Sequence, residues 1–195
     1  FHPEAGIRDA QESRGLGDVY KRQHMELFRI KSNIDEIANA LTYQISLVST
    51  VFSGHIVKNY NLSYKQHVRL LLISTAQQIH LIDRLLFNNN YENREAIIHR
   101  IFIGQARMIA GLWPKLYEEG SLEFFSDKQL EYLKYPDKTE DHEINYPKGS
   151  LLWEFGEEIA FNSDMEKNHK IILKTIGTYK FYYLKNEQIM DYIRS

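Results

Sequence analysis

The sequence predicts an all-α fold: an up-down antiparallel helical bundle of three long helices, followed by shorter C-terminal helices. Apolar residues recur at intervals of three and four over long stretches, which is the spacing of amphipathic helices. The 195 residues include only 4 prolines and 10 glycines, so few positions interrupt a helix. Short turn-forming segments separate the apolar runs, and short turns make consecutive helices antiparallel neighbours.

The first long helix is predicted over residues 26–58, and residues 59–61 indicate a break after it. Ser63 is expected to cap the second helix, residues 64–87, because a serine side chain accepts a hydrogen bond from a free backbone N–H of the first turn. The asparagines at 88–90 predict the turn that ends this helix, since asparagine tolerates left-handed backbone.

The third long helix is predicted to begin at residue 91 or 92 and to run to residue 117. Pro114 is expected to kink or interrupt it, because proline removes one backbone donor. Gly120 is expected to terminate it. The apolar side of this helix is expected to carry Ala96, Ile97, Ile101, Met108, Ile109, Leu112 and Leu116.

These three helices and a short one, capped by Ser126 over residues 127–133, make a predicted bundle domain at 24–134. Residues 135–150 contain two prolines, a glycine and several charges, which predicts a linker or mobile loop.

Residues 151–195 are expected to form a C-terminal helical extension that packs on the bundle. A helix is predicted over 151–161, and Ser163 is expected to cap a further helix from Asp164. Residues 171–184 are ambiguous between helix and hairpin because they are rich in β-branched and aromatic residues. Their flanks favour helix.

The first 23 residues are expected not to belong to the domain. Residues 18–23 resemble the in-frame translation of a sequencing adapter, and residues 6–17 have no sustained helical or strand period. Residues 1–23 are therefore interpreted as a non-native or disordered segment and set apart from the fold. An ordinary disordered or helical N-terminal arm is the alternative.

Composition narrows the class of protein. Hydrophobic residues make up 43% and charged residues 26%, which is typical of globular domains. The absence of cysteine excludes disulfides and thiolate metal sites, and it fits a cytoplasmic protein. The stretch 96–113, taken as the most apolar one, is interrupted by four polar or charged residues and is too polar to span a bilayer, so no membrane partner is expected. The net charge of −2 does not favour nucleic acid as a partner, although it leaves it possible.

Arg94 and His99 are the candidate catalytic residues. The string Arg94-Glu-Ala-Ile-Ile-His99 resembles the Arg-x4-His signature of the HEPN ribonucleases, which are small all-α proteins, often toxins or defence effectors. The resemblance implies a metal-independent endoribonuclease, with the histidine as general acid or base and the arginine stabilising the phosphate in the transition state. Residues five apart on a helix lie about 140° apart, so the pair needs a helix start or a dimer to converge. The alternative is that Arg94 faces solvent and His99 lies at a helix surface or interface.

A second resemblance covers residues 61–133. Their order of helix, asparagine turn and helix, followed by Ser126-Asp-Lys-Gln129-Leu-Glu-Tyr132, resembles the Avd-like four-helix-bundle accessory proteins of diversity-generating retroelements. That family forms ring oligomers and binds a reverse transcriptase and nucleic acid. The resemblance implies a bundle that docks a protein partner. The acidic balance after Gly120 makes a protein partner or a homo-oligomer the expected one.

Two side-chain clusters in the C-terminal extension could serve binding. The glutamates at 154, 157 and 158 could do acid–base work, but such charge runs are usually solvated helix faces. The second cluster is aromatic and consists of Tyr179, Phe181, Tyr182 and Tyr183. It could stack bases, but it is interpreted as core packing plus an oligomer or partner surface.

No cofactor or metal site is expected, because the sequence has neither a Glu-x-x-His motif nor a phosphate-binding glycine loop. The sequence therefore predicts a non-enzymatic accessory or interaction protein, with a ribonuclease acting through Arg94 and His99 as the alternative.

Overall fold

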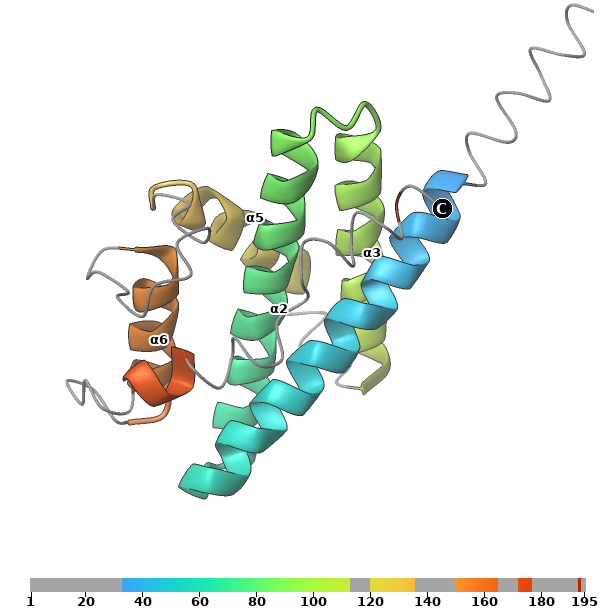
Figure 1. Ribbon diagram of the computed structural model, residues 1–195. Helices are drawn as coiled ribbons and strands as arrows, with labels where there is room; N and C mark the ends of the chain where they lie inside the picture. Colours follow the sequence, from blue (N-terminus) through green and yellow to red (C-terminus); the bar gives the residue numbers. More distant parts are fainter. Residues whose placement is uncertain (1–32, 113–119, 136–149, 165–171, 177–192, 194–195) are drawn as a thin grey trace, which may run out of the picture.

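A computed structural model describes residues 33–112, 120–135, 150–164, 172–176 and 193 of the chain (Figure 1). Every regular element within these ranges is helical and none is a strand, which confirms the predicted all-α bundle. The predictions for residues 1–23, for Pro114 and for most of the 135–150 linker fall outside the described residues.

Three long helices form the up-down-up part of the bundle. They are the first helix, Asn33–Tyr60, then α2, Tyr64–Asn88, and α3, Arg94–Leu112. Successive positions of the first helix meet successive positions of α3, through the contacts Asp35–Arg100, Thr42–Gln105 and Ser46–Met108. The first helix and α3 therefore run parallel, and the short turns on either side of α2 make it antiparallel to both (Figure 1).

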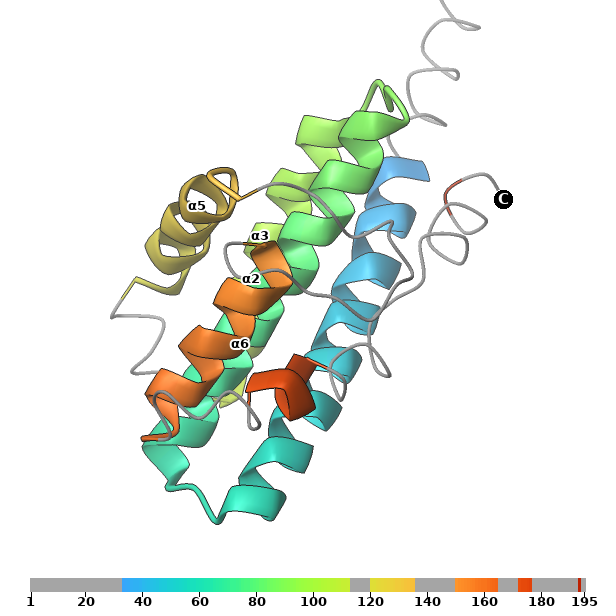
Figure 2. The same ribbon diagram turned by 60° about the vertical axis from the view of Figure 1, so that its left-hand side comes forward.

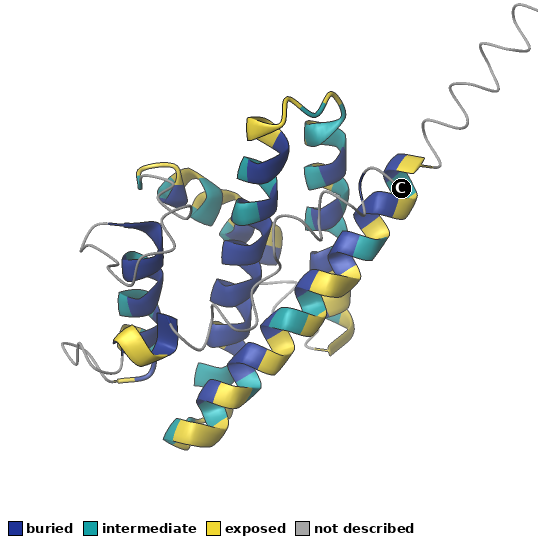
Figure 3. Ribbon diagram, in the orientation of Figure 1, coloured by how far each residue is buried: buried dark blue, intermediate teal, exposed yellow. Residues whose placement is uncertain are grey.

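Helix α2 is the centre of the molecule, and it packs against α3, α5 and α6. All residues from 70 to 80 are buried, so this helix is covered on every side in its middle (Figure 3). The buried stretch includes polar side chains as well as apolar ones. Among them are Gln77 and His80, which are 0% and 1% exposed.

The predicted cap of α2 is confirmed. Ser63 and Gln66 form a capping box, in which the Ser63 side chain accepts from the Gln66 backbone N–H at 3.4 Å and the Ser63 N–H donates to the Gln66 side chain at 2.9 Å. The break before it lies at Asn61, which has a φ of 51°, because residues 59 and 60 are still helical. The turn after α2 has Asn90 in the left-handed region, at a φ of 50°.

Helix α3 begins at Arg94, later than predicted. Two residues that were expected on its apolar side are exposed. Met108 is 40% exposed and Leu112 is 64% exposed. The side that meets the first helix instead buries Gln105, which donates to the Thr42 carbonyl at 2.7 Å. The prediction failed because it ranked positions by hydropathy, whereas the parallel contact with the first helix selects a face that contains a glutamine.

Helix α5 spans Ser121–Tyr132, so the prediction that Ser126 caps a helix at 127–133 is wrong. Ser126 is an exposed residue in the interior of α5. The helix extends back because Phe125, which is 0% exposed, lies two turns before the buried Tyr132 on the same side. Gly120 occupies the N-cap position of α5 with a φ of 87°, a conformation that glycine adopts without strain.

Helix α6, Leu151–Asn162, confirms the predicted helix at 151–161, and Ser150 caps it by accepting from the Trp153 N–H at 3.3 Å. Ser163 is the C-cap of this helix and not the start of another, and Asp164 has a φ of 56°, which a right-handed helix does not allow. That prediction is corrected.

Residues 172–176 are helical, in agreement with the favoured helix over the first part of the ambiguous segment. They pack closely on α6, because a Cβ placed on Gly156 would lie 2.9 Å from the Ile172 side chain. Figure 2 shows α5 and α6 beside α2, and the ring of Phe155 in α6 also meets Phe52 of the first helix, with centroids 5.9 Å apart.

The first helix is also the one described helix that is long and apolar enough to cross a membrane by length and composition alone. Within the fold, 39% of its most apolar stretch is buried. A helix that belongs to the core of a soluble protein passes the same test, so this property indicates an unusually apolar helix and no more. By this test the candidate span is the first helix and not the stretch 96–113.

Candidate functional site

The structure places Arg94 in a structural ion pair. Its Nε and Nη2 atoms donate to the two carboxylate oxygens of Asp83 in α2, at 2.7 and 2.8 Å. The guanidinium also lies 5.1 Å from the centroid of the Phe87 ring. The hydrogen bonds to Asp83 raise the pKa of Arg94, and burial opposes this only in part. The cation therefore ties the start of α3 to α2.

His99 is exposed on α3, and among the described residues no hydrogen bond joins it to Arg94. The five-residue spacing turns the two side chains to different sides of the helix. A role for the arginine at a phosphate would require it to exchange the Asp83 carboxylate for the substrate. Within the described chain, the two candidate catalytic residues are not brought together.

The predicted interaction residues Tyr179, Phe181, Tyr182 and Tyr183 lie outside the described residues, so their role stays a prediction. Within the described ranges, no group of three or more His, Asp or Glu side chains is arranged to hold a metal ion.

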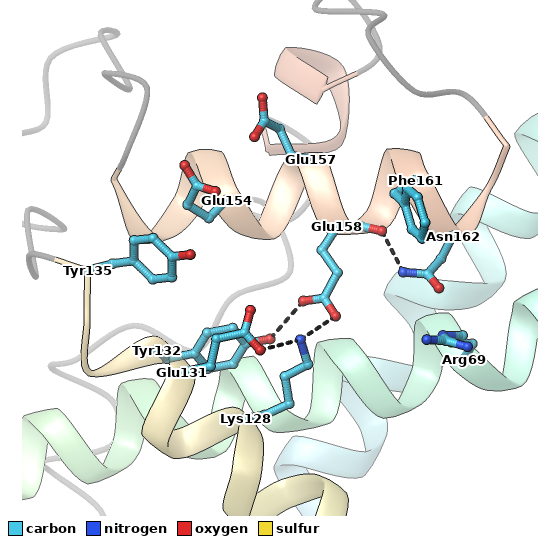
Figure 4. Close-up of a pocket in the computed structure, with 10 residues that line it drawn as sticks. All are labelled: Arg69, Lys128, Glu131, Tyr132, Tyr135, Glu154, Glu157, Glu158, Phe161 and Asn162. Carbon is cyan, nitrogen blue, oxygen red and sulfur yellow. Dashed lines mark hydrogen bonds and ion pairs between the residues drawn. The ribbon is translucent and has the colours of Figure 1, made fainter.

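A groove of about 360 Å³ lies between α5 and α6, over the start of α2 (Figure 4). Six charged side chains line it. From α5 and the residues after it come a lysine, a glutamate and two tyrosines; from α6 come three glutamates, a phenylalanine and an asparagine; and α2 adds an arginine. The lining residues are Arg69, Lys128, Glu131, Tyr132, Tyr135, Glu154, Glu157, Glu158, Phe161 and Asn162.

Helical spacing explains why these residues share the groove. Lys128, Glu131, Tyr132 and Tyr135 follow one another at intervals of three, one and three, which places them on one side of α5 and its continuation. In α6 the lining positions 154, 157, 158, 161 and 162 follow the same rhythm. The two sets of side chains meet where Lys128 and Tyr132 of α5 contact Glu158 of α6.

Lys128 is the ionic centre of the groove. Its Nζ lies 2.8 Å from Glu131 of its own helix and 2.6 Å from Glu158 of α6. Burial lowers the pKa of Lys128, but the hydrogen bonds and charges of Glu131 and Glu158 outweigh this effect, so the pKa is raised overall. The ammonium stays charged at neutral pH and is unsuited to act as a base or a nucleophile.

Tyr132 extends this network. Its hydroxyl donates to Glu158 at 3.3 Å, and its ring lies 5.7 Å from the Lys128 ammonium. The backbone carbonyl of Glu158 in turn accepts from the Asn162 side chain at 2.8 Å. The contacts of Lys128 and Tyr132 with Glu158 hold α5 to α6 at the floor of the groove, whereas the Asn162 bond lies within α6.

The walls of the groove are partly exposed. Tyr135 is half-buried, and burial together with the charge of Glu154 raises the pKa of its phenol. Phe161 is 59% exposed, and Glu157 forms no ion pair with any described residue. Four glutamates face two basic side chains in the lining, which leaves an excess of negative charge.

Sequence reasoning found half of this site. The glutamates of α6 were recognised as an acidic cluster, but the basic and aromatic residues of α5 were not connected with it. The signal was present in the spacing of Lys128, Glu131 and Tyr132, which a helix places on one face. It was missed because the partner of Lys128 is Glu158 in α6, and no local pattern connects residues 30 positions apart.

The string that carries the Avd-like resemblance lies in the second half of α5 and does not open the helix. Its Gln129 contacts α2, where it donates to the Ala76 carbonyl at 3.0 Å and meets the His80 Nδ1 atom at 3.0 Å. Comparison of the chain with family models, with curated proteins and with solved structures gives no match in any of the three. The resemblances to the Avd-like and HEPN families stay predictions.

Proposed function

We propose that the chain is a non-enzymatic interaction protein that binds a basic, amphipathic segment of a partner protein in the groove between α5 and α6. The observation that carries this proposal is the excess of carboxylates in a groove with exposed aromatic walls. Opposite charge steers a partner to the groove, and the aromatic surface adds apolar contact area.

The state of the charged groups favours binding over catalysis. Lys128 is held by two carboxylates and kept protonated, so it lacks the features of a nucleophile. Its ion pairs fix the floor of the groove, whereas Glu157 and Phe161 at the rim are available to a ligand. Proteins that handle nucleic acid carry basic segments of the kind that would fit here.

The test uses two labelled helical peptides with the same apolar face, one bearing arginines on its polar face and the other glutamates. Fluorescence anisotropy with the full chain should show binding of the basic peptide alone, weakening as salt is raised. Glu157→Lys should reduce the affinity roughly five- to tenfold. The matched control is Glu92→Lys, an exposed position before α3, which should leave the affinity unchanged. Equal binding of both peptides, or equal effects of both substitutions, contradicts the proposal.

A further inference from the structure

The outward side of the first helix exposes three large apolar side chains in its middle third, with the exposed polar residues Gln44 and Thr50 beside them. Tyr43 is 61% exposed, Leu47 47% and Val51 42%. Figure 3 shows exposed positions along the whole length of this helix, on the side away from α2. On α3, the partly exposed Met108 borders this surface, with its sulfur 3.2 Å from the Ser46 hydroxyl. An apolar strip on a monomer's surface indicates a contact with something else.

The strip has a regular order. Its members lie on one face, within about 80° of each other around the helix axis. Their spacings are four, three, four, four, three and four, so the order of spacings is the same from either end, with Leu47 at the centre. We name this set the outer stripe, and it consists of Glu36, Ala40, Tyr43, Leu47, Val51, Gly54 and Lys58.

The charges at the two ends of the outer stripe are opposite in sign, and the ends are equally far from Leu47. An acidic residue, Glu36, stands at one end and a basic residue, Lys58, at the other, and both are exposed. Neither forms an ion pair with any described residue. A two-fold rotation about Leu47 exchanges the two ends, as an interface between identical copies requires.

Gly54 adds a feature that the single chain does not explain. It lies inside a helix, where glycine costs about 1 kcal/mol relative to alanine. A Cβ added there would meet nothing within 4 Å. By contrast, Gly104 in α3 is needed, because its Cβ would lie 2.8 Å from Thr42. Small residues at 40 and 54 allow another helix to approach closely.

We propose that two copies of this chain form a dimer in which their first helices pack antiparallel through the outer stripe. Glu36 of each copy then lies beside Lys58 of the second copy, Tyr43 lies beside Val51, and Leu47 meets Leu47 on the two-fold axis. Parallel packing would instead place Glu36 against Glu36 and Lys58 against Lys58, so the charges select the antiparallel arrangement. A heterologous protein would not need this symmetry.

The dimer goes beyond the groove function, since the outer stripe and the groove share no residue. Peptide binding and oligomeric state can therefore be measured on the same samples, and one can fail while the other holds.

The first test exchanges the terminal charges in the full chain. Sedimentation velocity should show a concentration-dependent dimer, which Leu47→Arg abolishes by placing two like charges on the axis. Glu36→Lys and Lys58→Glu should each weaken the dimer roughly tenfold, because each variant repels itself at both ends. A mixture of these two variants should restore dimerisation, since both end pairs are then attractive.

The second test fixes the register and uses the absence of native cysteine. Leu47→Cys should form a disulfide-linked dimer on mild oxidation, because the two Cα atoms on the axis of closely packed helices lie within disulfide range. Val51→Cys is the matched control: its two thiols would be separated by about 12 Å along the antiparallel helices and should not link. Mixing Val51→Cys with Tyr43→Cys should link the two chains.

A chain that stays monomeric at all concentrations overturns the proposal, as does a dimer that survives Leu47→Arg. Equal cross-linking of the Leu47→Cys and Val51→Cys variants overturns the register. Circular dichroism shows whether each variant is still folded. The substituted positions Tyr43, Leu47 and Val51 are exposed, and Glu36 and Lys58 are exposed at the ends of the stripe.

Discussion

Helix α2 and the first helix distribute their polar and apolar residues in opposite ways. In α2, the fully buried stretch at 70–80 contains serine, threonine, two glutamines and a histidine. In the first helix, tyrosine, leucine and valine side chains are exposed to solvent. The first helix is also the one described helix apolar enough to pass for a membrane span, although much of it lies at the surface.

The difference shows that position in the bundle, in addition to hydropathy, decides which residues are buried. Helix α2 is surrounded because three other helices and the first helix pack against it, so its polar side chains are buried whether or not they find partners. The first helix has neighbours on one side only. Its apolar outer side therefore indicates a requirement that the single chain does not meet, since exposed apolar area brings no stability to a monomer.

The largest effect that tests this comparison is the loss of a core side chain in α2. Ile79 is 0% exposed, so Ile79→Ala should lower the free energy of unfolding by about 3 kcal/mol through lost burial and a cavity. Leu47→Ala in the first helix should change it by less than about 0.5 kcal/mol. Urea denaturation should be done at a low chain concentration, because dimerisation adds to apparent stability. Similar losses for both variants would contradict the comparison.

Smaller changes in stability are expected when two buried glutamines are replaced by leucine. Gln105 is 2% exposed and donates to Thr42 at 2.7 Å while accepting from Ser46 at 3.0 Å, so Gln105→Leu should cost about 1–2 kcal/mol. Gln77 is 0% exposed, and its amide has no hydrogen-bond partner among the described residues. Gln77→Leu should therefore be neutral or stabilising by about 1 kcal/mol. Thermal denaturation should show a lower melting temperature for Gln105→Leu and an unchanged or higher one for Gln77→Leu, and a loss in both variants would show that Gln77 has a partner.

The fold was predictable wherever local chemistry decides it. The capping box at Ser63 and the left-handed asparagine at 90 are properties of a few adjacent residues, and both were placed correctly. The start of α5 was not, because Ser126 is as good a cap by type as Ser63. What decides between them is the burial of Phe125 against residues distant in the sequence.

The candidate site was predictable in part for the same reason. Its acidic residues are neighbours in the sequence, so composition reveals them. The contact of Lys128 with Glu158 joins two helices across the linker region, and no local pattern contains that information. The same holds for Arg94, whose partner Asp83 lies on the preceding helix. A motif such as Arg-x4-His specifies residue types at a given spacing. It does not show that the arginine is already paired with a carboxylate of another helix, which only the fold reveals.

The smallest effects concern Arg94 and His99, and they separate a structural role from a catalytic one. Arg94→Ala should lower the free energy of unfolding by about 1 kcal/mol, because it removes a partly exposed bidentate pair between α2 and α3. His99 is exposed and unpaired among the described residues, so His99→Ala should change the free energy of unfolding by no more than a few tenths of a kcal/mol.

His99→Ala is therefore the clean test of ribonuclease activity, since any loss of cleavage cannot be ascribed to unfolding. With an interaction role, a fluorogenic RNA should stay intact with both the unmodified chain and the variant. Cleavage by the unmodified chain that His99→Ala removes, with an unchanged melting curve, would instead establish the catalytic reading and would mean that Arg94 leaves Asp83 when RNA binds.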